Sequence, residues 1–218
     1  MMARRAEDRG GIDAGLRERF GWTPYRVLAG TALLGCAVVL LCDVVMWFLV
    51  EGYDPLGQTI SELAAGPHHE VQDGGLVVFC LGILALATGL VLRGEGTPLA
   101  WAVRGAFVLL AVDVALIALW NEYGDGQPGG LEIHRVCVGV LYVLVAFLLW
   151  FGPSVKPVRG SRLAKVSKGM ALAWVVGAPL FYVLPDGIDG AYERVLALVM
   201  VGAVAIAAWR LYRSPEDA

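Results

Sequence analysis

The sequence predicts an all-α integral membrane protein, a bundle of six transmembrane helices, and three observations carry this prediction. First, 58% of the 218 residues are hydrophobic and only 17% are charged, whereas soluble domains average about 45–50% apolar and about 25% charged residues. Second, apolar stretches recur that are long enough to cross a bilayer, which takes about 20 residues. Third, these stretches are continuously apolar instead of alternating, which predicts helices rather than barrel strands.

The charge balance excludes a nucleic-acid-binding protein. The formal net charge is −3 at pH 7, whereas nucleic-acid-binding domains carry a basic surface that meets the phosphates. The apolar content also excludes a disordered chain, which has few hydrophobic residues. We therefore expect the chain to contact membrane lipids and no nucleic acid. We also expect a multi-pass protein of the cell membrane, in particular of the prokaryotic plasma membrane.

The apolar stretches follow one another along the chain, separated by short polar or Gly/Pro-containing breaks. The first four are clearly delimited, whereas the fifth and sixth have polar residues at their ends. The spans are predicted at about 27–50, 75–92, 99–120, 133–152, 168–184 and 191–211. They form one membrane domain at 27–213, between a charged arm at 1–26 and a short tail at 214–218. The arm is too long and too charged for a cleavable signal peptide.

The distribution of Lys and Arg predicts the orientation of the bundle. The N-terminal arm and the loop after the fourth span are rich in both residues, whereas the segments 51–74, 121–132 and 185–190 contain neither. Since cytoplasmic loops carry the excess of Lys and Arg, both chain ends are predicted to be cytoplasmic. Aromatic belts agree: Trp22, Trp101, Trp150 and Trp209 fall at predicted inner ends, and Trp47, Trp120, Tyr123 and Tyr182 at outer ends.

Small residues predict where helices approach each other closely. Gly82, Ala85 and Gly89 share one face of the second span. Gly169, Ala173 and Gly177 recur every four residues in the fifth. Such stripes let backbones come near each other in a membrane, although the same residues are also common in ordinary membrane helices.

The first outer loop is predicted to contain a short amphipathic helix between spans 1 and 2. Asp54 suits the N-cap, Pro55 suits the first helical position, and Gly66-Pro67 ends the helix. One face of this helix would be apolar and lie on the bundle or the membrane surface; it carries Leu56, Ile60, Leu63 and Ala64. Ser61 and Glu62 point elsewhere and either roof a cavity or stay solvated.

Two carboxylates lie inside predicted spans, at similar depth in the outer half of the bilayer. Asp43 and Asp113 are each about seven residues from the outer end of their span. A charged group in hydrocarbon is costly, so each is expected to face the bundle interior and to be paired, hydrogen-bonded or protonated. They serve either as plain contacts between helices or in handling a proton or ligand.

Two arginines lie at the outer ends of predicted spans, where the helices begin. Arg135 follows His134 at the start of the fourth span, and Arg194 follows Glu193 at the start of the sixth. Helix N-termini attract anions, so Arg135, Arg194 and Glu193 are candidates for a ligand or anion site that suits a phosphate head group. The alternative is that both arginines reach the interface and pair with neighbouring acids.

No cofactor and no metal are expected. Haem needs two histidines within the spans, and the three histidines of the chain, His68, His69 and His134, are predicted outside them or at their edge. A zinc site built from these histidines and a carboxylate is the weaker alternative, because adjacent histidines on one loop rarely bind the same ion. The four cysteines lie within spans and are expected to be small buried apolar residues. Cys80 and Cys137 share one depth, so whether these two form a disulfide stays open.

Three segments together resemble a known family. They are the loop Ile60-Ser61-Glu62-Leu63, His134 at the outer start of the fourth span, and Gly190-Ala-Tyr-Glu-Arg194 before the last span. In these the chain resembles the multi-pass membrane proteins grouped as domain of unknown function 998. The acid after the loop serine is Glu62 and the acid before the arginine is Glu193, whereas Ala64 stands where the family usually has glycine. The resemblance implies a fold of about six helices and brings no established reaction, substrate or catalytic residue.

Three functions fit these patterns. The first is an outward-facing polar cavity that binds or processes a lipid-like or amphipathic molecule, with catalytic candidates Asp43, Ser61, Glu62, Asp113 and His134. The second is a small proton-coupled permease that uses Asp43 and Asp113. The third is an accessory or sensory subunit without chemistry, whose protein partner and oligomeric state the sequence leaves open. Whether the chain is an enzyme therefore stays open at this point.

The six-span topology is tested by a reporter that works only in the cytoplasm, fused after residue 218. We expect signal from this fusion, because an even number of spans returns the C-terminus to the side of the basic N-terminal arm. A reporter that works only outside the cytoplasm, fused at the same place, serves as the control. Activity of that second reporter would contradict the topology.

Overall fold

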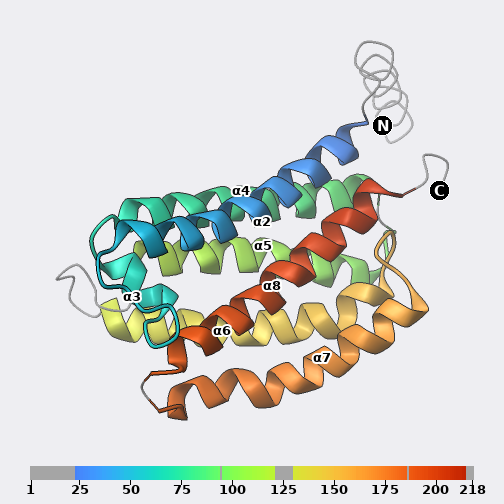
Figure 1. Cartoon of the computed structure of the whole chain (residues 1–218). Coiled ribbons are helices and arrows are strands. Elements are labelled where there is room, and N and C mark those ends of the chain that lie inside the picture. Colours follow the sequence, from blue (N-terminus) through green and yellow to red (C-terminus); the bar gives the residue numbers. More distant parts are fainter. Residues whose placement is uncertain (1–22, 94, 121–129, 186, 215–218) are drawn as a thin grey trace.

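The computed structural model describes residues 23–93, 95–120, 130–185 and 187–214 (Figure 1). Within this part of the chain every regular element is helical. The six long helices are α2 (Pro24–Leu49), α4 (His69–Arg93), α5 (Pro98–Leu119), α6 (Gly130–Phe151), α7 (Ser161–Leu180) and α8 (Asp189–Tyr212). Each of the six predicted spans corresponds to a helix that is long and apolar enough to cross a membrane. The predicted all-α bundle with six candidate transmembrane helices is confirmed.

The helices extend beyond the apolar stretches that predicted them. α4 begins at His69 instead of about residue 75, and α7 begins at Ser161 instead of about residue 168. The reason is that helical hydrogen bonds continue through polar residues once a helix is started. Short 3₁₀ turns, η2 (Gly152–Ser154) and η3 (Phe181–Val183), prolong α6 and α7. The residues of the charged arm up to 22, the outer loop 121–129 with Tyr123, and the tail 215–218 lie outside the described residues.

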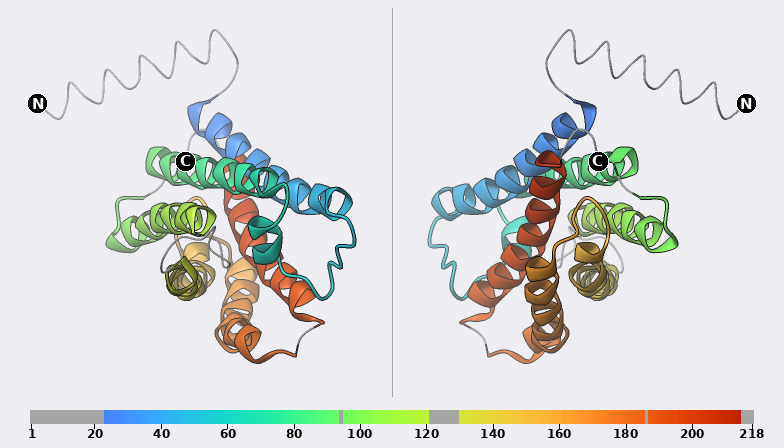
Figure 2. Two further views of the ribbon diagram at one scale, coloured as in Figure 1. Left: turned by 90° about the vertical axis from the view of Figure 1, so that its left-hand side faces the viewer. Right: turned by 90° about the vertical axis from the view of Figure 1, so that its right-hand side faces the viewer.

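The helices pack mostly against their neighbours in sequence, and α8 crosses back over the bundle (Figures 1 and 2). α2 packs most extensively against α4 and also against α8, and the series α4, α5, α6, α7 follows in order. The start of α2 and the end of α8 meet at one end of the bundle, where the Tyr25 hydroxyl donates a hydrogen bond of 3.3 Å to the carbonyl of Ser214. Because the first and the last long helix meet at this end, the six helices return the chain to the end of the bundle where it began. The cytoplasmic location of that end stays a prediction.

Small residues bring α2 and α4 together. A Cβ at Gly35 would lie 3.0 Å from the carbonyl oxygen of Val78, and one at Gly82 would lie 3.3 Å from the Cα of Ala32. Such backbone proximity maximises dispersion contacts between helices in lipid, where no hydrophobic force drives them together. The predicted close-packing role of Gly82 is therefore confirmed, whereas Gly169 of the other predicted stripe has open space around it.

The short outer helix forms, but it begins later than its sequence predicted. α3 (Ile60–Ala65) is capped by Thr59, whose side chain accepts from the backbone N–H of Glu62 at 3.0 Å, while the Glu62 carboxylate accepts from the backbone N–H of Thr59 at 2.7 Å. This reciprocal capping box starts the helix at Ile60. The predicted N-cap Asp54 instead accepts from the N–H of Leu56 at 3.0 Å and closes a turn, so Leu56 is not part of the helix.

Packing between α2 and α4 is tested by adding one methyl group. Gly35→Ala should lower the melting temperature in detergent, because overpacking of a close contact costs about 1–3 kcal/mol. The matched control is Gly30→Ala on the same helix, where no atom lies within 4 Å of the added carbon; this change should leave the melting temperature unchanged or slightly raised, because alanine favours helix. Equal effects of both changes would contradict the close approach.

Candidate functional site

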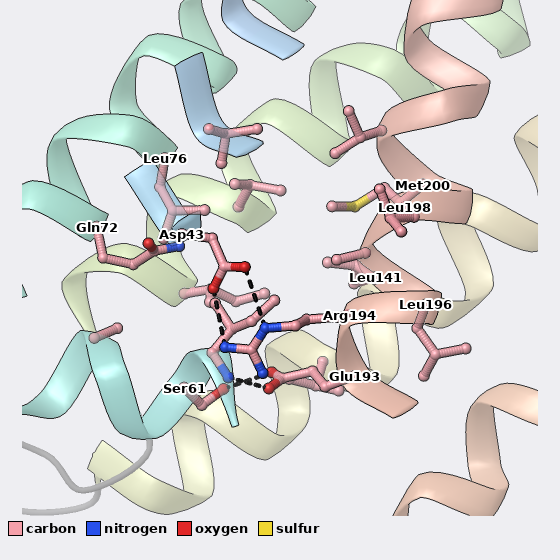
Figure 3. Close-up of a pocket in the computed structure, with 18 of the residues that line it drawn as sticks. Asp43, Ser61, Gln72, Leu76, Leu141, Glu193, Arg194, Leu196, Leu198 and Met200 are labelled. Atoms are coloured by element: carbon pink, nitrogen blue, oxygen red, sulfur yellow. Dashed lines mark hydrogen bonds and ion pairs between the residues drawn. The ribbon is translucent and has the colours of Figure 1, made fainter. Parts of the chain in front are cut away.

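A cavity of about 390 Å³ lies at the α3 end of the bundle. It is walled mainly by α2, α6 and α8, with α4, α5, α7 and η3 contributing and α3 as its cover. It stays open because α8 packs well against α2 but only sparsely against α6. Figure 3 shows this space and the side chains around it.

Most side chains around the cavity are apolar. Leu76 on α4, Leu141 on α6, and Leu196 and Met200 on α8 are examples (Figure 3). Most of the polar groups gather at one end of the space, beside α3. The prediction of a polar cavity therefore needs correction: the space is an apolar chamber with a polar end.

The polar end is built around an ion pair between α2 and α8. Arg194 Nη2 lies 3.1 Å from Asp43 Oδ1, and Nε lies 3.2 Å from Oδ2. The two side chains are only 11% and 13% exposed. This two-point pairing of guanidinium and carboxylate is the strong form of the interaction, and it shows that Asp43 faces the interior with a partner, as predicted.

The same guanidinium also holds the first outer loop. Its Nη1 donates to the backbone carbonyls of Pro55 at 3.0 Å, Gln58 at 2.9 Å and Gly190 at 3.0 Å, and its Nη2 donates to the hydroxyl of Tyr53. The Arg194 guanidinium therefore donates its hydrogen bonds to groups of the protein itself. Of the two roles predicted for this arginine, neutralisation of a neighbouring acid is the one that the geometry favours.

The loop and the start of α8 touch at backbone level. The N–H of Ala191 donates to the carbonyl of Leu56 at 2.9 Å, and any Cβ at Gly190 would collide with the backbone of Gln58. Glycine is therefore required at residue 190 by the close approach of the loop. Burial raises the pKa of Tyr53 to about 12, so its hydroxyl stays protonated at neutral pH and donates to the Gln58 carbonyl at 2.9 Å.

Ser61, Glu193 and His134 meet next to this anchor, although they come from α3, α8 and α6. The Ser61 hydroxyl donates to Glu193 Oε1 at 2.9 Å and lies 3.4 Å from His134 Nε2. Glu193 Oε2 accepts the backbone N–H of Ile60 at 2.5 Å. Figure 3 shows Ser61 and Glu193 directed toward each other. All three side chains line the cavity.

The orientation of His134 follows from its second ring nitrogen. His134 is 4% exposed, and its Nδ1 lies 2.9 Å from the carbonyl oxygen of Trp120. A carbonyl only accepts hydrogen bonds, so Nδ1 carries a proton. In the neutral ring the lone pair is then on Nε2, which faces Ser61.

Arg135 differs from Arg194 in its surroundings. It lines the cavity and its side chain is exposed. Within the described part of the chain it makes no hydrogen bond or ion pair, whereas Arg194 uses its guanidinium on Asp43 and the loop. The positive charge of Arg135 is therefore available at the polar end of the cavity.

Two further buried polar groups have no partner among the described residues. Asp113 is 4% exposed, and its Oδ2 accepts no hydrogen bond there; it faces the interior, as predicted, but it does not line the cavity. Gln72 is 1% exposed, lines the cavity, and has an unpaired Oε1. A buried amide oxygen without a partner is costly.

The other candidates are used elsewhere or are not brought together. Glu62 caps α3. His69 Nδ1 lies 3.0 Å from Asp73 and His68 Nδ1 lies 3.9 Å from Glu70, so neither meets His134. Among the described residues no group of three His, Cys, Asp or Glu side chains is arranged to hold a metal ion. Cys80 and Cys137 are both free thiols.

Sequence reasoning missed three groups that shape the site: Thr59, Tyr53 and Gln72. Thr59 was recognisable, because Thr59-x-x-Glu62 is the pattern of a capping box. Tyr53 and Gln72 have no local signal. Their roles depend on Arg194 and on the cavity, which distant segments form.

A comparison with protein-family models assigns the chain to a family. The family model described as "Protein of unknown function (DUF998)" matches residues 33–210. The chain belongs to this family. The match to the DUF998 model spans every residue of the site, from Asp43 to Arg194, and confirms the resemblance seen in the loop and helix starts. No curated protein and no solved structure matches the chain.

The anchor is tested by removing its two charges singly and together. Arg194→Gln should lower the melting temperature in detergent more than Asp43→Asn, because the arginine also bonds three carbonyls. Breaking a buried pair typically costs about 3–5 kcal/mol. The double change should cost less than the sum of the single changes, as expected for directly coupled residues.

A surface pair provides the control for this experiment. Arg159 Nη2 lies 3.1 Å from Glu95, and its side chain is 56% exposed. Arg159→Gln should shift the melting temperature little, because exposed pairs contribute about 0–1 kcal/mol. An Arg194→Gln protein as stable as the Arg159→Gln protein would contradict the anchoring role.

Proposed function

We propose that this membrane protein binds an amphipathic, lipid-like molecule in the cavity. The apolar part would lie along Leu141, Leu196 and Met200, and the polar part at Ser61, His134 and Arg135. The observation that carries the proposal is an apolar chamber of about 390 Å³ with most of its polar groups at one end. Ligand pockets of about 300–1,000 Å³ are of this kind, apolar with a few polar groups that fix orientation.

The wall of the cavity between η3 and α8 supports entry of a ligand from the bilayer. Tyr182 on η3 and Leu198 on α8 both line the cavity and remain 52% and 54% exposed. α8 and η3 contact each other only sparsely. An apolar chain can therefore pass from the lipid phase into the chamber between α7 and α8 without crossing water.

The proton-coupled permease has less support. Both oxygens of Asp43 are paired with Arg194, and Asp113 does not belong to the cavity wall. A carrier also needs a polar path to both ends of the bundle, whereas the polar groups of this cavity gather mainly at the α3 end. An accessory subunit without chemistry would have no ligand in the chamber, which the experiment below decides.

The proposal also states which side of the membrane the cavity faces. The α3 end would face the outside of the cell membrane, because the segments 51–74 and 185–190 at this end contain no Lys or Arg. The ligand would then be drawn from the outer leaflet. The cytoplasmic end would carry the basic residues at the start of α7.

Ligand binding is tested by filling the chamber. The purified full chain should bind a fluorescent lysophospholipid whose label is on the acyl chain, and Met200→Trp should weaken binding at least tenfold, because the larger ring occupies the space of the apolar chain. The matched control is Leu172→Trp, a residue of α7 that is 61% exposed and does not line the cavity. Equal binding by both variants, or no binding by the wild-type chain, would contradict the proposal.

A further inference from the structure

Ser61 has a chemical environment that the binding of a lipid-like molecule does not require. Its hydroxyl donates to Glu193 Oε1 at 2.9 Å, and its Oγ also lies 3.4 Å from a second possible acceptor, His134 Nε2. A serine hydroxyl that is close to a histidine nitrogen, with the histidine itself oriented by a third group, is the arrangement of an activated nucleophile. The third group is the carbonyl of Trp120, 2.9 Å from His134 Nδ1.

We propose that Ser61 is the nucleophile, and His134 the general base, of an esterase site that acts on the amphipathic molecule in the cavity. This inference rests on the proposed function, since the apolar chamber would hold the acyl chain. The substrate class is an amphipathic carboxylic ester with a long acyl chain.

The position of Ser61 is well defined for such a role. α3 carries it in the first turn, and this turn is held by the Thr59–Glu62 capping box and by the 2.5 Å bond from the Ile60 N–H to Glu193. Catalytic groups work only when their supporting contacts hold them in place. The Ser61–His134 distance is long for a hydrogen bond, as such distances often are in sites without substrate.

The charges around Ser61 suit the proton transfer. His134 presents the Nε2 lone pair to Ser61, so it can take the hydroxyl proton. The resulting imidazolium would be attracted by the Glu193 carboxylate, which is hydrogen-bonded to the same serine. Arg135 lines the cavity, and its guanidinium has no partner among the residues that the structure describes; a positive charge there would stabilise the oxyanion that forms from the ester carbonyl.

The reaction balances without a redox partner. Ser61 Oγ forms a bond to the carbonyl carbon, the C=O electron pair moves onto oxygen, and His134 Nε2 takes the Oγ proton. The tetrahedral intermediate collapses, the bond to the alcohol oxygen breaks, and His134 returns the proton to the leaving alcohol. Water then attacks the acyl-Ser61 ester with the same proton relay and releases a carboxylic acid, which restores Ser61.

The test uses the full chain in detergent and an alkyl fluorophosphonate, which reacts covalently with activated serines. Mass spectrometry should find the adduct on Ser61, and Ser61→Ala should abolish it. His134→Gln should slow labelling about 10²-fold or more, the usual contribution of a general base. The matched control is Ser167→Ala on α7. This change removes a buried hydroxyl that donates to the carbonyl of Leu149 at 2.6 Å, and it should leave labelling unchanged.

A second measurement separates this inference from the proposed function. Ser61→Ala and His134→Gln should keep a cooperative melting transition in detergent, which shows that they fold, and only the wild-type chain should release the labelled fatty acid from the fluorescent lysophospholipid. Binding by the wild-type chain without an adduct on Ser61 would overturn the esterase inference and leave the binding function intact. An adduct on Ser61 in a chain that binds no lysophospholipid would support the nucleophile and overturn the proposed ligand.

Discussion

The site depends on one buried guanidinium. Arg194 of α8 is paired with Asp43 of α2, and it also donates to three backbone carbonyls, of which two belong to the first outer loop. A charge with 11% exposure must be compensated by opposite charge and hydrogen bonds, because lipid supplies neither. The loop therefore folds back over the helix ends. Its attachment sets where α3 lies, and α3 carries Ser61.

The chamber beneath α3 is a consequence of unequal helix packing. α2 and α4 approach through Gly35 and Gly82, whereas α8 reaches across the bundle to α2 and stays largely apart from α6. The space between is lined by large apolar side chains that do not fill it. Its walls are mostly apolar, and most of its polar groups lie at the end beside α3.

Two arginines with similar sequence contexts have different roles. Each follows a titratable residue near the start of a long helix, yet Arg194 is used in pairing and Arg135 is free within the described chain. The difference arises because Asp43 and the loop carbonyls surround the former. The charge of Arg194 is compensated by Asp43, whereas Arg135 lines the cavity with an exposed side chain that has no partner among the described residues.

The sequence alone predicts the six candidate spans, the all-α class, the inward-facing carboxylates and some of the residues that meet at the cavity, such as Ser61, His134 and Arg194. It does so because lipid requires continuous apolar helices and penalises isolated charges, and both rules act on short stretches of chain. The partner of Asp43 is 151 residues away, and His134 is 73 residues from Ser61. Such pairings depend on the rotation and tilt of each helix against the others, which only the packed bundle decides. The start of α3 and the apolar character of the cavity differ from the sequence prediction, the former because the Thr59–Glu62 capping box starts the helix at Ile60, and the latter because side chains from distant segments shape the cavity.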